Sequence, residues 1–320
     1  MFQNLRNGND DNRQMSTRDA LHAFAHRRQS WTSRDGKQPR QRFKWHIYDN
    51  NGSFNGWFDW LPLRMRVGYW SPVAVMFLVV FYYSIYAYMP QPLEFPVLSR
   101  EVDSFWWKAD CFVGVWCIFV VVHASRSMGS IGGFYISYTG WSWIILASRA
   151  LLDASSEVIA PSHANLAKSM ATLASSLRFP ASVAAFVTFT IWNFVLLPII
   201  CFLATPPGEK REKFLRFNFG FFMTNIHILN LPLAMVNNIY GGSARTFGES
   251  DLWMGCLVVA LYTVLYLFVM DRIGLHFYPI FCPRSASCAL SFGSVLYLYY
   301  MLMHKGNELI LYLNPDLSQV

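Results

Sequence analysis

Long apolar runs recur along this chain, and they limit its possible folds more than any other feature of the sequence. A helix needs about 20 mostly apolar residues to cross a bilayer. Hydrophobic residues form 54% of the 320 residues and charged residues only 14%, a balance outside that of ordinary soluble domains. We predict an all-α, polytopic transmembrane helix bundle of about six to seven spans within residues 69–304. The apolar runs are 72–89, 111–124, 131–152, 180–204, 218–238, 252–270 and 286–303.

The segments outside these runs are polar. Residues 1–68 are rich in Asn, Asp, Gln, Arg and Ser, so we expect a mostly disordered arm. Its last part, 54–68, mixes aromatic and basic residues and predicts either a short interfacial helix or a simple linker. Residues 305–320 are expected to form a short C-terminal tail. Residues 153–177 are too polar to span a membrane, and they predict an exposed loop with one amphipathic turn.

Positive charge is concentrated ahead of the apolar runs. Twelve of the 26 Lys and Arg residues precede Trp70, in a chain with a net charge of +7. Because basic residues accumulate on the cytosolic side of membrane proteins, we predict a cytosolic N-terminus. The localisation expected is integral and multi-pass, in an endomembrane or the plasma membrane. No nucleic-acid-binding motif accompanies the charge, so nucleic acid is not an expected partner.

The cysteines lie singly and form no CxxC pair. Most fall inside or beside apolar runs, where a thiol behaves as a small hydrophobic group. We therefore predict no metal site and no cofactor. Arg149 lies within the run 131–152, and its long side chain is expected to reach the membrane interface.

A polar stripe runs along the apolar stretch 218–238, which reads NFGFFMTNIHILNLPLAMVNN. At 100° per residue, Thr224, His227, Asn230 and Asn237 share one side of the expected helix. Polar side chains in hydrocarbon cost a few kcal/mol, so this side should face protein or a water-filled cavity. His227, near the middle of the stretch, is the first candidate functional residue, and interhelical hydrogen bonding is its structural alternative.

Thr139 is the second candidate. It lies about eight residues into the third expected span, with Tyr138 and Trp141 beside it, at a depth within a few Å of that expected for His227. An imidazole that takes the hydroxyl proton makes threonine a nucleophile. Asn230, one turn along from His227, would fix the imidazole tautomer or donate to an oxyanion. Substrate contacts are expected from Tyr138, Trp141, Asn193 and Asn230. For Asn193, interhelical packing is the alternative.

These motifs resemble those of a known family. Gly132-Gly133, then Tyr-Thr-x-Trp at 138–141, a mid-membrane histidine 88 positions after the threonine, and the cluster 276–281 are similar to the androgen-induced-gene and androgen-dependent TFPI-regulating protein family, with its rolling-stone-like relatives. The resemblance covers roughly residues 132–283. It implies an intramembrane threonine hydrolase that cleaves fatty acid esters of hydroxy fatty acids, with Thr139 as nucleophile and His227 as base.

Two classes of function follow. In the first, a membrane lipid hydrolase takes up a fatty-acyl ester from the bilayer and cleaves it with Thr139 and His227. In the second, the same polar core binds a lipid or a partner without turnover, in a scaffold or transport role. The approach of Thr139 to His227 distinguishes the two.

Overall fold

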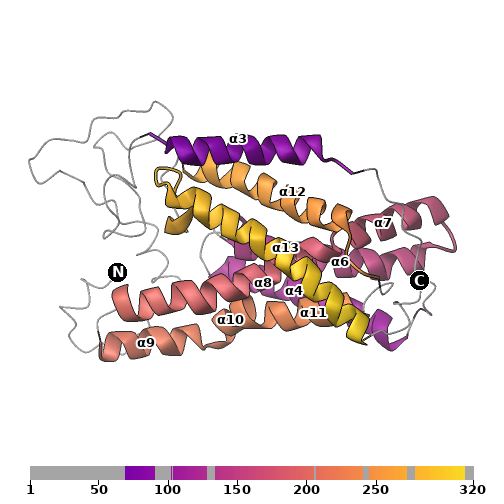
Figure 1. Ribbon diagram of the computed structural model, residues 1–320. Coiled ribbons are helices and arrows are strands. Elements are labelled where there is room, and N and C mark those ends of the chain that lie inside the picture. Colours follow the sequence, from indigo (N-terminus) through magenta and orange to yellow (C-terminus); the bar gives the residue numbers. More distant parts are fainter. Residues whose placement is uncertain are drawn as a thin grey trace, which may run out of the picture. The chain divides into compact units, whose positions relative to one another are not determined.

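The computed structural model describes residues 69–90, 102, 104–127, 134–204, 207–240, 245–271 and 278–313. Every regular element in these ranges is a helix, as the sequence predicts (Figure 1). The polar arm 1–68, with the expected interfacial helix at 54–68, lies outside the described residues. The last helix, α13 (Ser287–Leu313), continues beyond the end of its apolar run into the segment expected to be a tail.

Three helical stretches are long and apolar enough to cross a membrane: Phe105–Arg126, Ala164–Phe202 and Glu249–Met270. A fourth arises if Glu209–Asn218 and Phe221–Ile239, which meet at a bend of 54°, form one span. The helix α4 (Phe105–Ser127) extends the short run 111–124 to 23 residues. One side of α4 stays exposed and apolar, as a surface in contact with lipid requires. It carries Phe112, Val115, Ile118, Phe119 and Val122.

The chain divides into two compact units, of which the first comprises Met1–Ala87, Ser125–Gly133 and Val259–Ser294. Its described part contains α3 (Pro72–Ala87) and the adjoining parts of α12 (Glu249–Leu265) and α13, with the π-helical η5 (Tyr266–Met270) and the 3-10 turn η6 (Pro279–Phe281). A small apolar core is formed by Ala74, Cys288 and Phe292, with Phe77 and Phe281 packed against it.

A buried ion pair stabilises this first unit. Arg284 donates to both oxygens of Asp271, at 2.5 and 3.0 Å, and each side chain is only 1% exposed. The Trp70 indole N–H donates to the same carboxylate at 3.2 Å. Every oxygen of the carboxylate is thus bonded, as burial of a charge requires.

The second unit comprises Tyr88–Ala124, Phe134–Val258 and Val295–Val320. Its main helices are α6 (Tyr138–Ile159), α7 (Ala164–Ser176), α8 (Arg178–Thr190) and α11 (Asn230–Tyr240). The π-helical turns η2 (Ile191–Leu196) and η3 (Ile199–Ala204) extend α8. The helix α9 (Glu209–Asn218), the short α10 (Phe221–Thr224) and the π-helical η4 (Asn225–Leu229) lead into α11. The candidate functional residues all lie in this unit.

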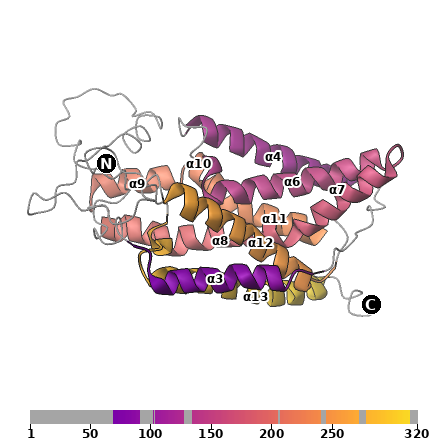
Figure 2. The same ribbon diagram turned by 90° about the horizontal axis from the view of Figure 1, so that it is seen from above.

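The prediction of an exposed loop over 153–177 is wrong. The helix α6 continues to Ile159, and α7 then packs against it, side by side in both views (Figures 1 and 2). Small side chains on α7 permit this close approach, and they are buried against α6 and α8. They are Ala167, Ala171 and Ala174. The composition that indicated a loop is therefore that of a closely packed helix pair.

Candidate functional site

His227 lies in a π-helical turn rather than in a regular α-helix. The turn η4 contains one more residue than an α-helical turn, so its backbone carbonyls lose their usual partners. Side chains replace them: the Asn193 amide donates to the His227 carbonyl at 3.1 Å, and the Trp143 indole donates to the Ile226 carbonyl at 3.3 Å. Such turns are found frequently at functional sites.

A second π-helical turn, η2, faces the first. The Trp192 indole stacks on the His227 imidazole with ring centroids 4.0 Å apart and planes 9° from parallel. The indole N–H in turn donates to the Asn218 side-chain oxygen at 2.9 Å. These contacts fix the orientation of the imidazole. Its Nδ1 atom is buried and accepts no hydrogen bond from any described residue.

The helix α6 and the stretch from η4 to α11 run in the same direction, as two contacts between them show. Trp143 contacts Ile226 near their beginnings, and the Arg149 guanidinium donates to the Asn237 side-chain oxygen further along both. The pair Arg149 and Asn237 is separated by 88 positions. The same separation pairs Thr139 with His227, which lie ten residues earlier on each side.

Two further pairs lie between these ends. At the same separation of 88 positions, Ser142 would be paired with Asn230 and Leu146 with Ala234. At 100° per residue, Thr139, Ser142 and Leu146 fall within the arc of about 120° between Trp143 and Arg149, the two α6 residues bonded to η4 and α11. The shared face is therefore a sequence of layers, with an apolar layer of Leu146 and Ala234 separating two polar ones.

The layer that includes His227 contains buried polar atoms without partners. Asn230 is fully buried, and neither its amide nitrogen nor its oxygen has a hydrogen-bond partner among the described residues. The same holds for the hydroxyl of Ser142 on α6 and for that of Thr188 on α8. A buried polar group left unpaired costs about 1–3 kcal/mol, so the concentration of such groups here indicates a place for a polar ligand or water.

The layer beyond Leu146 is ionic, and its side chains contact one another. Arg149 is 2% exposed, and it contacts Asn237 and Asp153, while the Asn237 amide donates to Asp110 of α4. The prediction that Arg149 extends to the membrane interface is therefore wrong. Its guanidinium is retained in the interior because the Asp153 carboxylate and the Asn237 amide are available there.

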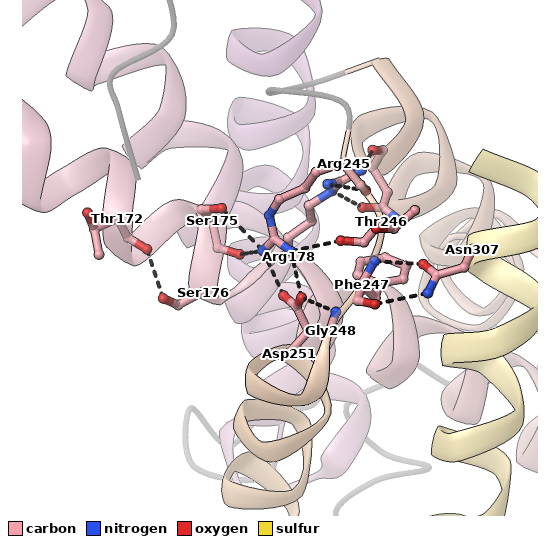
Figure 3. Close-up of polar contacts among 11 residues, drawn as sticks. Thr172, Ser175, Ser176, Arg178, Arg245, Thr246, Phe247, Gly248, Asp251 and Asn307 are labelled. Atoms are coloured by element: carbon pink, nitrogen blue, oxygen red, sulfur yellow. Dashed lines mark hydrogen bonds and ion pairs between the residues drawn. The ribbon is translucent and has the colours of Figure 1, made fainter. Parts of the chain in front are cut away.

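A second arginine cluster follows at the C-terminal end of α11. Arg178 donates to the side-chain and backbone oxygens of Asn238, at 2.6 and 2.9 Å, and to the Arg245 carbonyl. Arg245 pairs with both oxygens of Asp251, which also accepts the Gly248 N–H at the start of α12 (Figure 3). Asn307 exchanges two hydrogen bonds with the Phe247 backbone. The cluster stabilises the connection between α11 and α12.

The other residues expected at the site take different positions. The Tyr138 hydroxyl is bonded to that of Tyr299 on α13, and the Trp141 indole donates to the Tyr135 carbonyl. Asn193 supports the π turn through its amide. Among these, only Asn230 keeps unpaired polar atoms beside His227.

Thr139 is buried at the first turn of α6, next to the cap in which Ser137 accepts from the Gly140 N–H. Within the described residues no hydrogen bond joins its hydroxyl to His227. Ser142, Thr188 and the stacking partner Trp192 escaped the sequence analysis. For Ser142 a signal existed, because its separation from Asn230 equals that of Thr139 from His227.

Among the described residues, no three His, Cys, Asp or Glu side chains are grouped so that they could hold a metal ion. Comparison with family models, with curated proteins and with solved structures finds no match to this chain.

Proposed function

We propose that this protein is an integral membrane hydrolase that cleaves fatty-acyl esters, with Thr139 as nucleophile and His227 as base. The observation that carries the proposal is the buried His227 imidazole, whose Nδ1 accepts no hydrogen bond from any described residue. Thr139 is assigned beside it by counting back from Arg149 and Asn237, which are bonded to each other at the same separation of 88 positions. The resemblance of the surrounding motifs to the androgen-induced-gene family supports the same assignment, and membership of that family is part of the proposal.

In the reaction proposed, the Thr139 oxygen attacks the acyl carbon while His227 takes the hydroxyl proton. The imidazolium then gives this proton to the departing alcohol oxygen. Water attacks the acyl-threonine next, with His227 again accepting a proton, and the fatty acid leaves as the threonine hydroxyl is restored. The indole of Trp192 keeps the imidazole plane fixed through both steps.

The membrane arrangement proposed has six to seven spans and a cytosolic N-terminus. Support comes from the helices long and apolar enough to cross a bilayer, from the shorter apolar helix α3, and from the basic residues that precede Trp70. An ester of low polarity would reach the site laterally from the hydrocarbon.

Fluorophosphonate labelling of the purified full-length protein tests the proposal. Wild type should be labelled, and Thr139→Ala and His227→Ala should each abolish the labelling while the protein stays folded. Thr263→Val is the matched control, because this buried hydroxyl already donates to the Ala260 carbonyl at 2.8 Å and belongs to the other unit.

A second function is favoured by one observation. Thr139 and His227 are not hydrogen-bonded to each other within the described residues, as a site that binds a lipid without turnover would allow. An unlabelled wild type, under conditions where a serine hydrolase is labelled, would establish this alternative and exclude the hydrolase.

A further inference from the structure

Ser142 and Asn230 follow Thr139 and His227 in the neutral layer. Each lies three residues further along its helix, so the two pairs are stacked one helical turn apart, about 5 Å. Both residues are fully buried, and none of their three side-chain polar atoms has a partner among the described residues. Asn230 is directed to the same side of α11 as Asn237, which is seven residues later and bonded to α6.

Thr188 adds a third group from α8. This helix runs antiparallel to α11, since Arg178 contacts Asn238 and Asn193 contacts His227. Thr188 lies a third of the way from Asn193 to Arg178 in sequence. This places it at the level of Asn230 and Leu231 on the neighbouring helix. Its hydroxyl is buried and unpaired as well. Three helices therefore bring hydroxyl and amide groups to one depth.

The chemistry of these groups selects a neutral ligand. Two hydroxyls and one amide provide hydrogen-bond donors, and residues 139–146, 185–192 and 227–234 contain no Lys or Arg. Arg149 lies beyond Leu146 and Ala234 and is bonded to Asn237. A carboxylate would be buried at this level without a cation, at high cost, whereas a carbonyl oxygen needs only donors.

We infer that Ser142, Thr188 and Asn230 form a sub-site that binds the carbonyl oxygen of a neutral acyl lipid. This inference deepens the proposed function. The statement that the bound carbonyl belongs to the ester to be cleaved rests on that proposed function. During attack by Thr139 the same donors would receive the negative charge that develops on the oxygen. Binding itself requires no turnover, and it is tested separately.

The test is photolabelling of the full-length protein in phospholipid nanodiscs by a long-chain methyl ketone that carries a diazirine and an alkyne. Ser142→Ala, Thr188→Val and Asn230→Leu should each raise the half-labelling concentration about fivefold, the effect of one neutral hydrogen bond. Ser156→Ala is the control on the same helix, because this buried hydroxyl already donates to the Asp153 carbonyl.

Two outcomes would overturn the sub-site. The first is unchanged ketone labelling in Ser142→Ala and Asn230→Ala, both folded by circular dichroism and size-exclusion chromatography. The second is competition by a long-chain fatty acid anion as strong as that by unlabelled ketone. Failure of the hydrolase is a different result, because fluorophosphonate labelling would then be absent while the ketone is still bound in a Ser142-dependent way.

Discussion

Two polar layers on the same pair of helices have opposite character. Around Arg149 and Asn237 the groups are charged and bonded to one another, whereas around His227 and Asn230 they are neutral and several have no partner. The layers are ten residues apart on each helix, about 15 Å. Bonded charge in the first layer stabilises the packing of three helices. Unbonded neutral groups in the second lower stability unless a ligand occupies them, so they indicate function.

The largest expected effect is that of Arg149→Met. Removal of the guanidinium leaves Asp153 and Asn237 buried without it, and breaking a buried polar network of this kind costs about 3–5 kcal/mol of the free energy of unfolding. Chemical unfolding in detergent measures the loss. Arg216→Met is the control, because the exposed pair with Glu212 contributes about 0.5 kcal/mol or less. A loss below 1 kcal/mol for Arg149→Met would remove the structural role assigned to the ionic layer.

Gly140→Ala extends the comparison to the backbone that begins the neutral layer. A Cβ atom at this position would collide with the Phe134 carbonyl oxygen, next to the Ser137 cap. We expect a loss of about 2 kcal/mol in unfolding free energy and a displaced Thr139, seen as reduced fluorophosphonate labelling.

Gly293→Ala is the matched substitution, since nothing lies within 4 Å of its Cβ position in the middle of α13. It should raise stability by up to about 1 kcal/mol. Equal effects of the two substitutions would show that Gly140 is not required at the start of α6.

Trp192→Phe separates packing from hydrogen bonding at the imidazole. A phenyl ring can still stack on His227, but the hydrogen bond to Asn218 is lost, at a cost of about 1 kcal/mol. Thermal unfolding measures this loss. Trp116→Phe is a control, because the described contacts of Trp116 are ring contacts only. A loss as large in Trp116→Phe would mean that the indole hydrogen bond contributes nothing.

The smallest expected effect is that of Ser142→Ala on the free energy of unfolding without ligand. It is also the most direct test of the difference between the two layers. Because its hydroxyl has no partner, its removal should change the unfolding free energy by less than about 0.5 kcal/mol or increase it. Ser156→Ala should instead lose about 1 kcal/mol through its bond to Asp153. A loss of that size in Ser142→Ala would mean that the two layers do not differ in kind.

The sequence predicts helices well here because long apolar runs allow little else in a membrane. It also assigns similar depths to Thr139 and His227, because depth along two helices follows from residue number, and their pairing stays a prediction. Polarity was misleading in 153–177, where Ala167, Ala171 and Ala174 are buried by close helix contact rather than exposed. Arg149 was misplaced because its partner Asn237 lies 88 positions away in sequence.

The π turns were beyond prediction for another reason. Apolar periodicity indicates which side of a helix is buried, but it does not reveal a change from i+4 to i+5 hydrogen bonding over a few residues. The groups that replace the lost bonds, Asn193 and Trp143, come from other helices. Only the folded arrangement identifies them.

The π turn Asn225–Leu229 makes this site sensitive to chain length as well as to residue identity. Loss of one residue there would return the helix to regular α geometry and turn everything after it by about 100°. Asn230 and Asn237 would then leave the side that faces Arg149, although no side chain among them had changed. The extra residue of the π turn thus sets the rotation of α11 about its axis, so that both polar layers face the same side.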